Sequence, residues 1–114
     1  MGAHLDQPEA APNPPEVKVM FDVDRVIHEP ARLAIVAVLA ACEAADFRYL
    51  RNVTGLTQGN LSVHVGKLEQ AGYVAVEKRF IDKKPNTLYH LTDAGRQAFE
   101  RYRKDVGKLL QTGD

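Results

Sequence analysis

The sequence has few of the features that mark secreted or membrane proteins. It holds one cysteine, Cys42, which cannot form a disulfide within the chain, so we expect a reducing compartment. The longest apolar run, residues 33–42, is about half of the roughly 20 residues that a membrane-spanning helix needs. Acidic residues and prolines stand where a signal peptide has an apolar stretch. With 114 residues, 45% of them hydrophobic and 26% charged, the sequence predicts one small, soluble, cytoplasmic domain.

The formal net charge is zero, but the charges are unevenly distributed. Residues 1–24 hold five acidic side chains and one basic side chain, whereas residues 47–90 hold seven basic and three acidic ones. An acidic segment followed by a basic one permits a polyanionic partner without requiring it.

The N-terminal residues differ in composition from the rest of the chain. Residues 1–16 contain four of the six prolines and almost no bulky apolar side chains. Such a segment cannot offset the entropy cost of ordering, so we expect a disordered, acidic and proline-rich arm. Residues 17–114 are expected to form the domain, starting with one or two helical turns within residues 19–27.

Apolar periodicity and capping residues predict four helices in this domain. Asp46 and Thr57 are suited to cap the helices that follow them, and Gly55 is suited to end the second helix in the left-handed conformation. The expected helices cover residues 30–44, 47–54, 58–71 and 93–111.

After Gly72 the apolar period changes from that of a helix to that of a strand. Strands are expected over 73–80 and 87–91, joined by a charged turn over 81–86 with Pro85 and Asn86 at its centre. The order helix–helix–helix–strand–strand–helix predicts a mainly α fold with a small β-hairpin, of the α+β class. The second and third helices would form a helix-turn-helix, and the hairpin would form a wing.

The first and last helices have more apolar surface than one small core uses. The helix over 30–44 is apolar on opposite sides, so it is either a central core helix or is covered by a second subunit. The last helix has a long apolar stripe, formed by Phe99, Tyr102, Val106 and Leu109. We therefore expect a homodimer built from these two helices and the segment before Pro30.

The helix over 58–71 has an unusual outward side. Leu61, Val65 and Leu68 form the stripe expected to face the core. Apart from Lys67, the opposite side has short or amide-bearing residues instead of the long charged side chains typical of a solvated helix. Two glycines cost about 1 kcal/mol each in a helix interior. Close approach to DNA would explain them, and a poorly optimised surface helix is the alternative.

This helix and the hairpin supply the expected DNA contacts. Amide side chains can pair with adenine, serine with several bases, and valine methyls with thymine, while hairpin lysines can reach phosphates or a narrow minor groove. The candidate DNA-binding residues are Thr57, Gln58, Gly59, Asn60, Ser62, Val63, Lys67, Arg79, Lys83, Lys84 and Asn86.

Residues 56–74, LTQGNLSVHVGKLEQAGYV, resemble the recognition helix and following strand of winged-helix transcription regulators. The chain is similar to the MarR and ArsR groups, and in particular to a compact MarR-like subgroup. Residues 46–50 (DFRYL), 87–96 (TLYHLTDAGR) and 30–35 (PARLAI) extend the resemblance over roughly residues 22–103. The resemblance implies a homodimeric repressor-type protein on a palindromic duplex site, with the helix over 58–71 in the major groove.

The resemblance also has residue-level consequences. The positions that match DNA-facing positions of the family are Gln58, Gly59, Asn60, Ser62, Val63 and Lys67. The chain departs from the family pattern at Gly66, where a basic residue is common. It departs again at residues 82–84, Asp-Lys-Lys, where many MarR proteins have Asp-x-Arg, and this weakens the case for minor-groove insertion of the wing.

Other functions have less support in the sequence. The four histidines, His4, His28, His64 and His90, and Cys42 do not stand at metal-ligand spacing, so we expect no metal site. Motifs for phosphate binding or nucleophilic catalysis are lacking, so we expect no enzyme and no cofactor. Two alternatives stay open. One is a winged helix that binds proteins and not DNA, and the other is a sensor of a small molecule or metal, with an effector pocket between the helix over 30–44 and the wing domain.

Overall fold

The computed structural model describes residues 14–111, so most of the arm expected over residues 1–16 lies outside the described residues. The elements follow in the order η1 (Val17–Phe21), α2 (Pro30–Ala41), β1 (Ala45–Asp46), α3 (Phe47–Thr54), α4 (Gln58–Gln70), β2 (Val74–Ile81), β3 (Lys84–Leu91) and α5 (Asp93–Leu110). This is the predicted α+β winged-helix order with one additional strand, β1. Within the described part of the chain, no helix is both long enough and apolar enough to cross a membrane.

Local capping fixes both ends of α3 and the start of α4 where the sequence predicted them. The side chains of Asp46 and Thr57 accept hydrogen bonds from the backbone N–H groups of Tyr49 (2.8 Å) and Asn60 (3.1 Å). Gly55 ends α3 with a φ of 73°, in the left-handed region that favours glycine. These interactions make the helix-turn-helix a short, well-defined connection.

Two expectations about the first half of the chain are wrong. The first helical turns form a 3-10 helix over Val17–Phe21, earlier than residues 19–27. Helix α2 ends at Ala41 and not at Ala44, and Cys42 is already extended. The extended backbone lets Ala45 and Asp46 pair with β3, and this tertiary pairing replaces the last helical turn.

The expected hairpin turn is also wrong in its centre. The turn lies at Asp82 and Lys83, whose φ values are 51° and 67°, and Pro85 and Asn86 belong to β3. Two central residues with positive φ match the right-handed twist of the flanking strands. Proline fixes φ near −65°, so Pro85 cannot occupy such a position.

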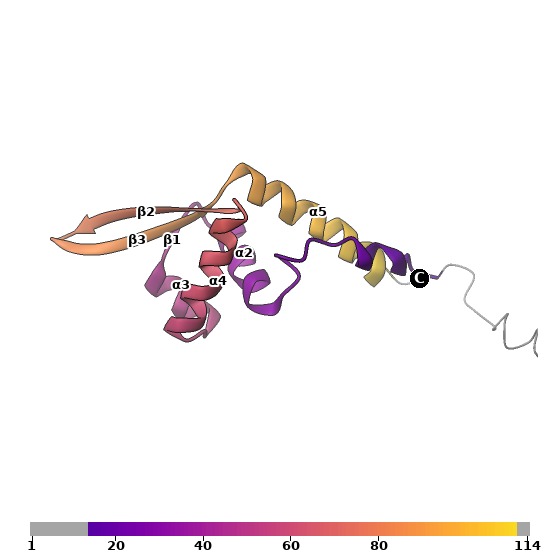
Figure 1. Cartoon of the computed structure of the whole chain (residues 1–114), viewed down its shortest axis with the longest axis horizontal. Helices are drawn as coiled ribbons and strands as arrows, with labels where there is room; N and C mark the ends of the chain where they lie inside the picture. The colour runs from indigo at the N-terminus through magenta and orange to yellow at the C-terminus, as the bar shows by residue number, and fades with distance from the viewer. Residues whose placement is uncertain (1–13, 112–114) are drawn as a thin grey trace, which may run out of the picture.

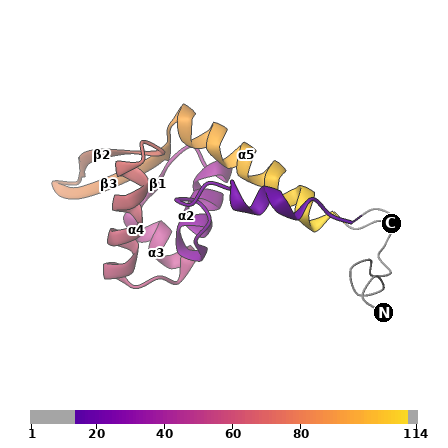
Figure 2. The ribbon, with the colours of Figure 1, turned by 45° about the vertical axis from the view of Figure 1, so that its right-hand side comes forward.

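The sheet has the order β1-β3-β2, and both pairings are antiparallel. Figure 1 shows β2 and β3 extending as a wing on one side of the helices, while α5 extends on the other. The molecule measures 75 × 26 × 25 Å along its principal axes. After a 45° turn, η1 still lies along the distal half of α5, with which it is in contact (Figure 2).

Helix α2 lies at the centre of the main core. Its Ile35, Val36 and Leu39 are fully buried, and it contacts α3, α4, α5 and β3. The sequence left open whether its apolar sides are covered by the core or by a second subunit. The core of the same chain covers most of them. A second, smaller cluster joins the N-terminal segment to α5 and consists of Val23, Ile27, Ala98 and Tyr102.

Candidate nucleic-acid interface

Helix α4 presents the outward side that the sequence predicted. Leu61, Val65 and Leu68 are buried against the core. Six of the predicted DNA-binding residues lie on exposed positions of this helix, namely Gln58, Gly59, Asn60, Ser62, Val63 and Lys67. The Val63 side chain is 56% exposed. The exposed side therefore combines amides, one hydroxyl, one apolar group and one cation.

Packing within residues 14–111 does not require glycine at either of the two glycine positions of α4. A Cβ atom added at Gly59 or Gly66 would have no atom of residues 14–111 within 4 Å, apart from its own neighbourhood on the helix. Gly95 of α5 is different, because a Cβ there would lie 2.2 Å from the backbone oxygen of Tyr73. Gly95 is thus required by the fold, whereas Gly59 and Gly66 are not.

The inner side of α4 is held by the start of α2. Arg32 donates from Nη1 to Nδ1 of His64 (3.1 Å), and Glu29 Oε1 lies 3.8 Å from the same nitrogen. Glu29 also caps α2 by accepting a hydrogen bond from the Arg32 backbone N–H (2.8 Å). This bond, helped by the nearby His64 and Arg32 side chains, lowers the pKa of Glu29 despite its partial burial. His64 is therefore a partly buried hydrogen-bonding residue at the edge of the core.

The chain just after α4 is fixed to the N-terminal segment. The Tyr73 hydroxyl donates a short hydrogen bond to Asp24 Oδ2, and Asp24 Oδ1 accepts from the backbone N–H groups of Val26 and Ile27. The hydrogen bond to Asp24, together with burial and the Asp24 charge, raises the pKa of Tyr73 to about 12. The chain that follows the C-terminal end of α4 is thereby anchored to the segment before α2.

The remaining predicted residues belong to the wing, except Thr57, which is the exposed N-cap residue of α4. Lys83 and Lys84 are exposed at its tip, and Arg79 is exposed on β2. Arg79 Nε donates to Asn86 Oδ1 (2.9 Å), and Asn86 Nδ2 donates to Asp46 Oδ2 (3.4 Å). Asn86 therefore has partners within the chain and links the wing to the start of α3. A DNA contact by Asn86 stays a prediction.

Two basic residues of α3 complete this surface and were not among the predicted contacts. Arg48 and Arg51 are exposed and line a hollow of about 640 Å³ together with Thr57 and Gln58 of α4. Their presence was visible only in the basic balance of residues 47–90. Their position beside the start of α4 depends on how α3 packs, which composition does not show.

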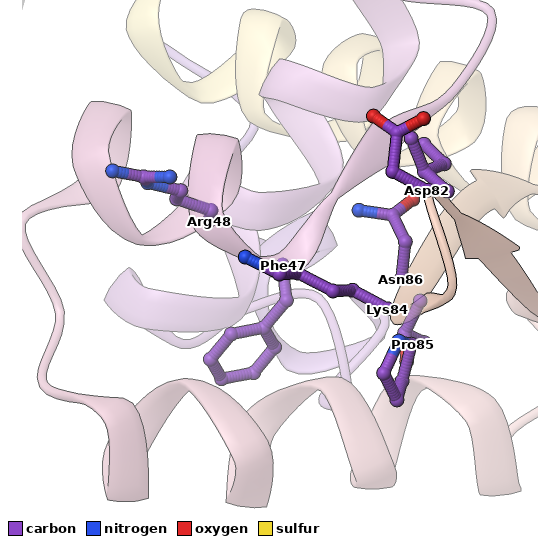
Figure 3. Close-up of a pocket in the computed structure, with 8 residues that line it drawn as sticks. Phe47, Arg48, Asp82, Lys84, Pro85 and Asn86 are labelled. Atoms are coloured by element: carbon purple, nitrogen blue, oxygen red, sulfur yellow. The ribbon is translucent and has the colours of Figure 1, made fainter.

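A second hollow, of about 620 Å³, lies between α3 and the wing. Figure 3 shows Phe47 and Arg48 on its α3 side and Asp82, Lys84, Pro85 and Asn86 on its wing side. The sequence placed an effector pocket between the helix over 30–44 and the wing domain, whereas this hollow lies beside α3. An effector stays a prediction. Among residues 14–111 we find no group of three or more His, Cys, Asp or Glu side chains able to hold a metal ion.

Comparison with known proteins agrees with this architecture. The chain matches the model of a winged helix DNA-binding domain over residues 31–110. It is 34% identical over 85 residues to the uncharacterized protein MJ0432 of Methanocaldococcus jannaschii, covering 75% of this chain and 92% of that protein.

Two solved structures are also similar. One is a transcriptional regulator homologue from Pyrococcus horikoshii, with a TM-score of 0.74 and 29% identity, covering 82% of this chain and 91% of that one. The other is a MarR mutant from E. coli complexed with operator DNA, with a TM-score of 0.62 and 20% identity, covering 81% of this chain and 71% of that one. The second likeness is one of fold. The chain thus belongs to the winged helix DNA-binding domain family, as a DNA-binding regulator with the fold of MarR-type proteins.

Proposed function

We propose that the protein is a homodimeric repressor that binds a palindromic duplex site through α4 and the wing, and that it catalyses no reaction. The outward side of α4 is the observation on which this proposal rests. Its small and amide-bearing residues are exposed, and its two glycines serve no packing need within the protein. A helix used only as a solvated surface gains nothing from such residues, whereas a helix in a major groove gains close approach and hydrogen bonds to base edges.

The contacts divide into two kinds in this proposal. Asn60, Ser62 and Val63, together with Gln58, read base edges, because amides, hydroxyls and methyls make directional or shape-dependent contacts. The cationic side chains hold the phosphate backbone with little sequence preference. This second group consists of Lys67, Arg79, Lys83 and Lys84 from the sequence prediction, with Arg48 and Arg51 added from the fold.

In the proposed dimer, η1 and α5 form the interface between the two subunits. Large apolar side chains on these two elements are exposed in the single chain, with Val17 at 53%, Phe21 at 73% and Leu110 at 68%. A second copy would remove them from water. Two copies related by a two-fold axis would then offer two α4 helices to major grooves about 34 Å apart, which suits a palindromic site.

A salt titration of DNA binding tests the proposal. We expect the full chain to bind duplex DNA with an affinity that falls steeply as salt rises, with a slope of about −0.9 per neutralised phosphate. Sedimentation of the free protein should give twice the chain mass of 12.6 kDa. Duplex binding that is absent at low salt would refute the DNA role and favour a protein-binding module. A stable monomer at micromolar concentration would refute the dimer.

A further inference from the structure

Close to its tip, the wing has an apolar pair that none of the proposed DNA contacts uses. Phe80 is 73% exposed, and Pro85, directly opposite it on β3, is also exposed. Exposed hairpin ends normally carry polar or charged residues, because these prevent the strands from associating with other proteins. An apolar aromatic ring at such a place is not buried, so it does not stabilise the fold. An aromatic residue at this place therefore calls for a ligand or a partner.

Strand alternation places this pair on the same side of the wing as the helices. Phe80 shares a face with Val74 and Val76, since side chains two residues apart point to the same side. Val74 belongs to the main core and Val76 packs against it, so this face is the one on which the helical layer lies. Figure 3 shows the Pro85 ring pointing to the same side as the half-buried Phe47 ring. The apolar pair thus lies on the helix side of the wing, beyond the part of the sheet that the core covers.

The charges around the pair select a polyanion as the partner. Lys78, Arg79, Lys83 and Lys84 are exposed on the same hairpin, against the two acids Glu77 and Asp82. An apolar pair surrounded by excess positive charge is complementary to a narrow, negative groove with apolar base faces inside it. It is a poor match for a neutral apolar protein surface, because the ammonium groups would lose their hydration.

We propose that Phe80 and Pro85 form a wedge that enters the minor groove next to the major groove occupied by α4. The wedge opens one base step and bends the duplex, as apolar side chains inserted from the minor groove do. It therefore favours flexible pyrimidine–purine steps, TA or CA/TG, at that place in the site, although no hydrogen bond reads them. This inference rests on the proposed DNA role of α4 and adds to it a second, shape-dependent source of sequence preference.

The test compares duplexes that differ only in the base step under the wing. A preferred duplex from selection is labelled at both ends, and its bend is measured by energy transfer with the full chain bound. We expect the wild-type protein to bend it and to bind a TA step about fivefold or more tightly than a GG step at the same place. Phe80→Thr keeps a strand-forming residue but removes the apolar ring. This variant should lose both the bend and the step preference.

Two variants of the same hairpin serve as controls. Ile81→Ala removes another exposed apolar side chain, 46% exposed, from the opposite face and should leave bend and preference unchanged. Lys83→Ala should lower the salt slope by about one and keep the bend. Phe80→Thr should instead keep the wild-type salt slope.

The outcomes are distinct. A bend and step preference in Phe80→Thr equal to those of the wild type would overturn the wedge. So would a fall in its salt slope as large as that of Lys83→Ala, because Phe80 would then act by shaping the hairpin for phosphate contacts. Wild-type binding to a straight duplex would also overturn the wedge and leave the proposed function standing. Failure of the wild type to bind any duplex would instead refute the proposed function itself.

Discussion

The two glycines of α4 allow stability and DNA binding to be separated in one experiment. Replacing Gly66 by Ala puts a methyl group into a mid-helix position where, apart from the helix's own neighbouring residues, no atom of the described chain lies within 4 Å. The variant should therefore unfold with a free energy higher by about 0.5–1 kcal/mol, because alanine loses less backbone entropy in a helix. In a domain of this size, that gain raises the melting temperature by about 4–8 °C per kcal/mol. Gly59, at the second position of α4, should gain less.

A methyl group at Gly59 should instead weaken DNA binding. If the start of α4 approaches the duplex closely, the Cβ added at Gly59 lies in the contact and costs about 1–3 kcal/mol, as overpacking does in a close-packed interior. Gly66→Ala should lose little affinity, because related proteins commonly have a larger, basic side chain at that position. Melting curves and fluorescence anisotropy on one protein preparation measure both quantities. Gly107→Ala on α5, where the added Cβ also meets no atom within 4 Å in residues 14–111, controls for the gain in stability without a change on α4. Sedimentation should show that all three variants keep the oligomeric state of the wild type.

The result that would refute this reasoning is specific. A Gly59→Ala variant that binds DNA as tightly as the wild type would show that no duplex comes close to this side of the helix. Its small residues would then reflect a poorly optimised surface.

Three further predictions follow from the geometry. Gly95→Ala should destabilise the fold by about 1–3 kcal/mol or more, seen as a lower melting temperature, because its Cβ would collide with the Tyr73 backbone. Since Asp24 raises the folded-state pKa of Tyr73 to about 12, above the unfolded value near 10, its contribution to stability should be complete below pH 10 and be lost as the pH rises from 10 to 12. Urea unfolding between pH 10 and 12 should show that the free energy of unfolding falls less steeply with pH for Tyr73→Phe than for the wild type. An equally steep fall in both proteins would contradict the raised pKa of Tyr73. Lys83→Ala and Lys84→Ala should weaken binding to preferred and random duplexes alike, and each should lower the salt slope by about one.

Local chemistry explains which parts of the fold were predictable. The caps at Asp46 and Thr57 and the left-handed stop at Gly55 depend on residues within one helical turn, so the sequence shows them directly. Strand β1 has two residues and no pattern of its own, because its existence depends on pairing with β3. Sequence composition does not identify Asp82 and Lys83 as the centre of the hairpin turn. Proline and asparagine are common in turns, so it favours Pro85 and Asn86 instead.

The candidate site divides in the same way. The composition of α4 pointed to its outward side, since helical periodicity determines which residues share a face. The contacts that hold α4, such as Arg32 with His64 and Tyr73 with Asp24, join residues 32 and 49 positions apart in the sequence. A single sequence gives no sign of such pairs. The same applies to Arg48, whose place beside the wing follows from the packing of α3.

The most direct test of the central claim, that α4 reads base edges, compares substitutions in α4 and in the wing on two duplexes. Affinities of the wild type, Asn60→Ala, Ser62→Ala and Lys83→Ala are measured on the duplex preferred in a selection and on random duplex at one salt concentration. We expect the Asn60 and Ser62 changes to cost about 1–3 kcal/mol on the preferred duplex and little on random DNA, while the Lys83 change weakens both alike. If the lysine change altered sequence preference and the Asn60 and Ser62 changes did not, α4 would not be the reading element.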